Sequence, residues 1–181
     1  MEDLSLHIID IVENSVRAEA TKISLDIETS IQENLLKIKL TDNGRGMDEE
    51  EIKLCDDPFF TTKKCGSTGL GISLLKQSAM EAEGSFKIES EKGRGTTISV
   101  SFRYDHIDRK PLGDIAKTFY ILIAAFPFVD FFFSYKKGEL SFEIDTAEMK
   151  KVLEDVPINA PDVLKTLKYY ISRGIKSVEK G

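Results

Sequence analysis

Asp42-Asn43-Gly44-Arg45-Gly46-Met47 is the first of three short glycine-bearing segments in the first hundred residues. The second is Gly66-Ser67-Thr68-Gly69-Leu70-Gly71, and the third is Gly93-Arg94-Gly95-Thr96-Thr97. All three follow a stretch with helical periodicity that contains Asp10-Ile11-Val12-Glu13-Asn14. One glycine-rich turn is weak evidence because such turns are common, but four segments in this order are hard to obtain by chance.

The apolar pattern between these segments predicts a two-layer α+β fold. Residues 3–19 and 69–82 have the period of helices, and residues 49–54 form a short helix that Asp48 and Glu51 cap. Alternation of apolar and polar residues predicts strands over residues 23–27, 36–40, 85–90 and 96–103. This order of elements is typical of a mixed, mostly antiparallel sheet with helices on one face.

The composition of the chain changes after Tyr104. We expect a first domain, a linker and a small α+β extension, at residues 1–104, 105–113 and 114–181. In the extension the apolar pattern predicts a helix, a hairpin and two more helices. One strand of the hairpin contains Phe131, Phe132 and Phe133, which cannot all point inward because neighbouring strand residues face opposite sides. We therefore expect the extension to serve in partner docking or dimerisation.

Asp10 and Asn14 lie one helical turn apart, so their side chains leave the same face of the first helix. The amide oxygen of Asn14 can ligate a Mg²⁺ ion that also holds phosphate oxygens. Asp10 can orient or deprotonate a nucleophile near a terminal phosphate. The alternative is a polar helix face in water, which we would favour for a lone Asn. The glycine segments that follow favour the binding site.

Asp42 ends a strand and opens a glycine turn, where its carboxylate can accept a hydrogen bond from an adenine amino group. Gly44 and Gly46 let the backbone approach a flat base without a Cβ clash. Thr96 enters a strand directly after a glycine and can place its hydroxyl beside the base. An ordinary hairpin turn is the alternative, but it does not explain the helix and long loop that follow.

The second glycine segment, Gly66–Gly71, leads into a helix with no bulky side chain at its start. Backbone amides at such a helix N-terminus bind phosphate oxygens readily. The Gly-x-x-Gly-x-Gly spacing departs from the dinucleotide fingerprint, and the segment does not directly follow a strand. A dinucleotide-binding Rossmann fold is therefore a poor interpretation.

Residues 3–103 resemble the ATP-binding domain shared by gyrase, the large heat-shock chaperone, histidine kinases and mismatch-repair ATPases, which is called the GHKL group. The resemblance lies in an N box and three glycine-bearing boxes, Asp10–Ala18, Asp42–Met47, Gly66–Gly71 and Gly93–Thr97. Asp57–Lys63 is similar to the phenylalanine-bearing lid of the histidine kinases, the branch that the chain resembles most. The family implies a Bergerat-type sandwich that holds ATP and Mg²⁺ between helices under a flexible lid.

The resemblance also implies roles for individual residues. Asn14 would ligate Mg²⁺, Asp42 would bind adenine, and Arg17 would contact phosphate. Asp10 would be the catalytic residue, although its position is usually Glu in the hydrolysing branches and often Asn in the histidine kinases. The other implied nucleotide contacts are Gly44, Gly46, Met47, Lys63, Thr68, Gly69, Leu70, Gly71 and Thr96.

The family resemblance predicts an ATP-dependent protein kinase or ATPase that phosphorylates or regulates a separate partner protein in signal transduction. The chain starts at the N box without the two-helix bundle that carries the phosphate-accepting His, so we expect the acceptor on another protein. His7 and His106 are weak acceptor candidates, because neither lies in an acceptor motif. The alternatives are a regulator similar to anti-sigma factors and serine kinases, an ATP-gated conformational ATPase, and a degenerate interaction module.

Composition narrows the class of partner. A net charge of −6 and a pI of about 5.1 do not favour nonspecific nucleic-acid binding. Residues 1–104 carry 13 basic and 19 acidic residues, so a triphosphate would need a metal ion to approach. The longest apolar stretch, residues 119–133, is shorter than the roughly 20 residues of a membrane span. The start of the chain lacks the basic opening of a signal peptide, and we expect Cys55 and Cys65 to be free thiols in the cytoplasm.

Overall fold

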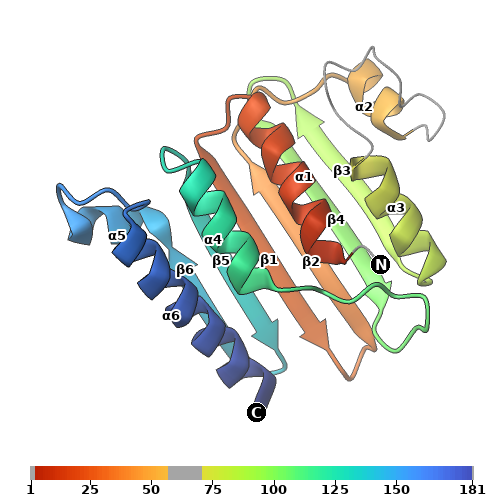
Figure 1. Ribbon diagram of the computed structural model, residues 1–181. Coiled ribbons are helices and arrows are strands. Elements are labelled where there is room, and N and C mark those ends of the chain that lie inside the picture. The colour runs from red at the N-terminus through yellow and green to blue at the C-terminus, as the bar shows by residue number, and fades with distance from the viewer. Residues whose placement is uncertain (1–2, 57–70, 181) are drawn as a thin grey trace.

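The computed structural model describes residues 3–56 and 71–180, without the side chains of residues 54–56, and is built on one open sheet of six strands. In chain order the elements are α1 (Leu4–Arg17), β1 (Lys22–Ser30), β2 (Leu35–Asp42), α2 (Glu49–Asp56), α3 (Gly71–Glu81), β3 (Ser85–Glu91), β4 (Gly95–Arg103), α4 (Ile115–Ala125), β5 (Asp130–Lys137), β6 (Leu140–Asp145), α5 (Thr146–Leu153) and α6 (Pro161–Lys180). The strand order across the sheet is β3-β4-β2-β1-β5-β6. Figure 1 shows α3, α1, α4 and α6 side by side over one face of this sheet.

The predicted α+β fold, with a mostly antiparallel sheet and helices on one face, is confirmed. Side-chain alternation is the physical reason. In the β1–β2 pair Leu25 lies opposite Leu40 on the face that the helices cover. The apolar residues of the two strands that are buried on this face are Ile23, Leu25, Ile27, Leu36, Ile38 and Leu40. The α1 residues that cover them are Leu4, Ile8, Ile11 and Val12. The opposite face of the sheet carries polar side chains such as Asp26 and Lys39.

The extension continues the same sheet. Strand β5 pairs parallel with β1, and β6 adds to its outer edge in antiparallel order. Phe131 and Phe133 are buried on the helix-covered face, where the ring of Phe133 lies 4.6 Å from that of Phe119 in α4. Phe132 faces the opposite side, as alternation requires. Neither α4 nor any other helix in the described residues is both long and apolar enough to cross a membrane.

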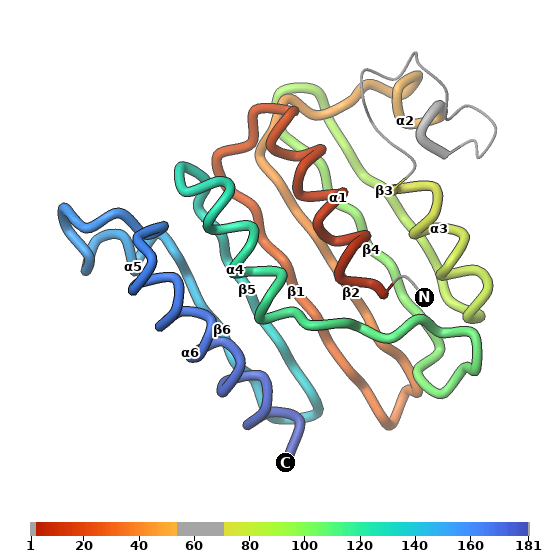
Figure 2. The backbone as a smooth tube through the Cα atoms, viewed as in Figure 1, coloured from red at the N-terminus to blue at the C-terminus, as the bar shows by residue number. Residues whose placement is uncertain are grey.

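The segment between β4 and α4 runs along the start of α1 (Figure 2). The backbone amide of Leu4 donates to the Pro111 carbonyl at 2.9 Å. Lys110 places its Nζ 3.3 Å from Nε2 of His7, a side chain that is only 2% exposed. The burial of His7 makes it a structural residue, and the contacts of this segment fasten the extension to the first helix.

Helix α5 begins at Thr146 and is short. It ends at Leu153 because Glu154 has φ 50° and ψ −110°, a backbone conformation that cannot continue a helix. The side chain of Asp145 accepts a hydrogen bond from the amide of Ala147 and caps the start of the helix.

Candidate functional site

One row of side chains crosses the sheet at the end of β2. Asp42 of β2 lies directly opposite Thr96 of β4, and Thr96 lies directly opposite Ser90 of β3. Directly paired residues of antiparallel strands project from the same face, so the three side chains are neighbours. The face is the one that α1 covers, because Ser15 of that helix bonds to Asp42. The structure therefore brings together residues from three separate parts of the sequence.

The carboxylate of Asp42 is held in place by two donors. The hydroxyl of Ser15 donates to Oδ2 at 2.7 Å, and the backbone amide of Gly44 donates to Oδ1 at 2.9 Å. The residue is 7% exposed. An ionised carboxylate has about four lone-pair sites, so each oxygen can still accept another hydrogen bond. The arrangement leaves Asp42 as a fixed acceptor.

Ser15 is a site residue that we did not identify from the sequence. It follows Asn14 in α1 and lies on the apolar side of the helix, close to Ile11 and Val12. A polar residue on a buried helix face requires a hydrogen-bond partner, and this requirement is the signal that could have revealed it. Its partner, Asp42, lies 27 residues away in the sequence.

Close backbone packing explains why two positions of the chain require glycine. A Cβ atom on Gly46, at φ +65°, would lie 2.0 Å from the carbonyl oxygen of Glu91. A Cβ atom on Gly95, at φ +100°, would lie 2.0 Å from the carbonyl oxygen of Asp42. The glycines thus let the turn after β2 pack directly on the turn between β3 and β4. Whether Gly44 and Gly46 also approach a base stays a prediction.

Helix α3 begins against Asp10 of α1. A Cβ atom on Gly71 would lie 2.7 Å from Cβ and 3.0 Å from Oδ2 of Asp10, so only glycine fits at this contact. The side chain of Asn14 lies one turn further along α1, and its Oδ1 accepts a 3.5 Å hydrogen bond from Arg17. Arg17 also pairs with Glu13 at 3.4 Å. Asp10 therefore contacts the start of α3, and Asn14 and Arg17 contact each other on the following turn of α1.

Some of the candidate residues cannot be placed. Lys63, Thr68, Gly69 and Leu70 lie outside the described residues, as do the segment that resembles a lid and Cys65. The side chain of Cys55 is likewise outside the description. Met47 is described, and its backbone amide donates to Oγ of Ser90 at 2.8 Å.

The oxygen ligands that these side chains offer are suited to a Mg²⁺ ion that arrives with a nucleotide. The described part of the chain contains no group of three His, Cys, Asp or Glu residues that could hold an ion alone. Mg²⁺ usually keeps several waters and binds one or two protein oxygens together with substrate phosphates. The half-buried Asn14 can supply one such oxygen, from the same face of α1 as Asp10, whose side chain contacts Gly71 of α3.

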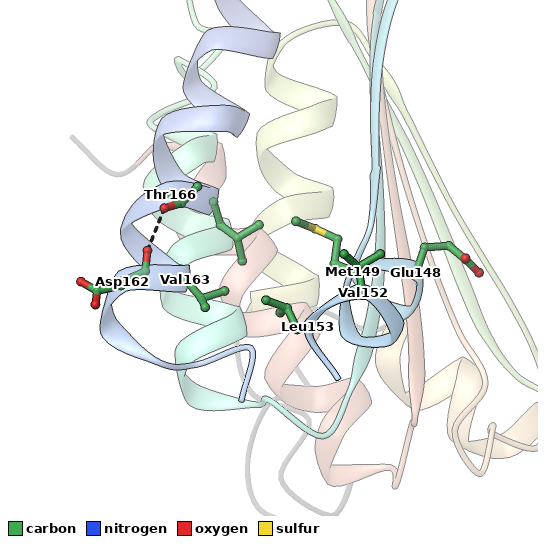
Figure 3. A pocket seen from close by; sticks show the side chains of 8 residues that line it. Glu148, Met149, Val152, Leu153, Asp162, Val163 and Thr166 are labelled. Atoms are coloured by element: carbon green, nitrogen blue, oxygen red, sulfur yellow. Dashed lines mark hydrogen bonds between the residues drawn. The ribbon is translucent and has the colours of Figure 1, made fainter. Parts of the chain in front are cut away.

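An apolar groove of about 560 Å³ lies between α5 and α6, away from the row of Asp42, Thr96 and Ser90 (Figure 3). Its lining residues are Glu148, Met149, Val152, Leu153, Asp162, Val163, Thr166 and Leu167. The hydroxyl of Thr166 donates to the backbone carbonyl of Asp162 at 2.9 Å, so it is already occupied. The groove lacks the converging polar groups that orient a small substrate.

Comparison with known proteins places the part of the chain that carries these residues in a family. The family model described as histidine kinase-, DNA gyrase B-, and HSP90-like ATPase matches residues 2–106. The chain is 34% identical over 97 residues to a putative sensor protein of Shewanella frigidimarina and 35% identical over 92 residues to sporulation kinase C of Bacillus subtilis. These matches cover 52% and 51% of this chain but only 15% and 21% of the relatives.

A solved structure supports the fold alone. The crystal structure of the N-terminal domain of a DNA repair protein aligns with 80% of this chain and 52% of its own, with a TM-score of 0.53 and 13% identity. The aligned share exceeds the part that the family model matches, so the structural likeness extends beyond residue 106.

Proposed function

The chain belongs to the family of histidine kinase-, DNA gyrase B-, and HSP90-like ATPases, and on this premise we propose that it binds ATP with Mg²⁺ and acts as a protein kinase or ATPase. The observation that carries the proposal is the buried carboxylate of Asp42, which Ser15 and Gly44 hold in place opposite Thr96. A fixed acceptor at the end of a strand suits the amino group of adenine.

In this proposal the remaining residues act on the phosphates. Asn14 supplies an oxygen to Mg²⁺, which neutralises phosphate charge when it is bound. Arg17 adds a positive charge one turn later, and the start of α3 at Gly71 supplies backbone amides. Lys63, Thr68, Gly69 and Leu70 keep the phosphate and lid roles that the family resemblance implies.

Asp10 is the proposed catalytic residue because it lies against the start of α3, where the phosphates are expected. In this proposal its carboxylate orients a nucleophile or accepts its proton. The proposed acceptor is a side chain of another protein. His7 is a poor acceptor, since it is buried and its Nε2 lies next to Lys110.

We further propose that the chain phosphorylates or regulates a separate partner protein in signal transduction. Sporulation kinase C, a relative, is named as a kinase, and the segment that resembles a kinase lid favours the same branch. The alternative is a regulator that binds its partner in an ATP-dependent way without phosphate transfer. Labelled ATP separates the two: transfer of label to a partner His or Asp supports the kinase, and a stable unlabelled complex supports the regulator.

Calorimetric titration with ATP and Mg²⁺ tests the binding site itself. Asp42→Asn keeps the size of the side chain but replaces an acceptor oxygen by a donor, so we expect at least about tenfold weaker binding. Asp26→Asn is the matched control, because Asp26 lies on β1 at the polar face of the sheet and also accepts from a serine, at 3.2 Å. Equal binding by both variants would contradict the proposal.

A further inference from the structure

Ser90 joins the first and last glycine segments through a single hydroxyl. Its Oγ accepts from the backbone amide of Met47 at 2.8 Å and donates to the backbone carbonyl of Gly95 at 2.9 Å. The same Oγ lies 2.8 Å from Oγ1 of Thr96. The motifs that carry the family resemblance do not include Ser90, which lies at the end of β3.

The single hydrogen of the Ser90 hydroxyl decides which residue donates in the hydrogen bond between Ser90 and Thr96. A serine hydroxyl has one hydrogen to donate and two lone pairs to accept. The carbonyl of Gly95 can only accept, so the hydrogen of Ser90 is used there, and one lone pair is used by the amide of Met47. The remaining lone pair must accept the hydrogen of Thr96. Thr96 then has no hydrogen left and offers only lone pairs to a ligand.

We propose that Ser90 orients the hydroxyl of Thr96 so that Thr96 and Asp42 together form an acceptor-only edge, which selects adenine over a purine with an exocyclic oxygen. The inference rests on the proposed ATP site and specifies its substrate class. Asp42 and Thr96 are directly opposite in the sheet, so both acceptors serve the same region. An amino group satisfies such an edge, whereas a carbonyl oxygen there meets only acceptors and stays unpaired.

Ser90 is thus a positioning residue, and its replacement has a specific consequence. In Ser90→Ala the hydroxyl of Thr96 loses its acceptor and can rotate to donate toward the ligand. A rotating hydroxyl accepts an amino group less well and tolerates a carbonyl oxygen better. The preference for adenine should therefore fall, which a general loosening of the site would not produce.

The test compares ATP with inosine triphosphate, which carries an oxygen in place of the amino group, by calorimetry in the presence of Mg²⁺. We expect Ser90→Ala to reduce the ratio of the two affinities about tenfold, and Ser90→Thr, which keeps the hydroxyl, to retain it. Ser85→Ala is the matched control, since Ser85 lies on the same strand and shares a 2.8 Å hydroxyl contact with Ser101. It should leave the ratio unchanged.

An unchanged affinity ratio in Ser90→Ala overturns the inference, whether both nucleotides bind as before or both bind equally more weakly. If thermal melting shows that Ser90→Ala is unfolded, Thr96→Val takes its place, because it removes the acceptor and keeps the shape; an unchanged ratio there overturns the inference equally. An unmodified chain that binds neither nucleotide would instead overturn the proposed function itself.

Discussion

Replacing Ser15 by alanine tests how the structure holds Asp42. The variant removes the 2.7 Å hydrogen bond from the Ser15 hydroxyl to Oδ2 of Asp42, between side chains that are 3% and 7% exposed. The carboxylate keeps only the amide of Gly44 as a donor within the described contacts. Because a hydrogen bond to a charged group contributes about 1.5–3 kcal/mol, we expect the free energy of unfolding to fall by about 2 kcal/mol.

Ser24→Ala is a close control for this prediction. The hydroxyl of Ser24 also donates to a carboxylate, that of Asp26, at 3.2 Å, but the bond lies on the polar face of the sheet where water competes. We expect this variant to lose less than about 0.5 kcal/mol. Urea unfolding monitored by circular dichroism gives both values, provided that the slope with denaturant is unchanged.

The same pair of variants links stability to nucleotide binding. If Ser15 positions the Asp42 carboxylate for adenine, Ser15→Ala should lower the affinity for ATP about tenfold, whereas Ser24→Ala should leave this affinity unchanged. Equal losses of stability in the two variants would refute the reasoning about burial. A normal ATP affinity in Ser15→Ala would refute the link between the helix and the base.

Four further variants probe the backbone and the extension. Gly46→Ala should lower the free energy of unfolding by about 3 kcal/mol or more in urea, because its Cβ would lie 2.0 Å from a backbone oxygen; Gly93→Ala, also at positive φ but with nothing within 4 Å, should lose only about 1 kcal/mol. Glu154→Gly should raise the melting temperature, since removing the Cβ relieves a backbone at φ 50° and ψ −110° that costs about 1 kcal/mol. Burial of Tyr135, with the nearby Glu179 carboxylate, raises its pKa from 10.0 to about 12. The folded state therefore binds the proton of Tyr135 more tightly than the unfolded state does. The free energy of unfolding keeps its full value below pH 10 and falls by about 2 kcal/mol as the pH rises to 12. Tyr135→Phe should remove this part of the alkaline loss in unfolding curves, and identical pH profiles for the two proteins would contradict it.

Local signals in the sequence determined the fold class and the order of the elements. The alternation in β1 and β2 has a period of two residues, and the stripe on α1 has the helical period, so both can be recognised within a short window. The turn after Asp42 was also recognisable within a short window, because it contains two glycines and one of them, Gly46, has a positive φ. The resemblance to the family also depended on such short segments.

Only the tertiary structure decided which distant residues meet. The partnership of Ser15 with Asp42, the link from Ser90 to Thr96, and the parallel pairing of β5 with β1 all depend on how the strands are ordered in the sheet. Side-chain periodicity shows which residues face the core, but it does not show which strand lies alongside which. The residue types that we propose to bind a nucleotide are therefore visible in the sequence, whereas the hydrogen bonds that orient their side chains emerge only when the strands are paired.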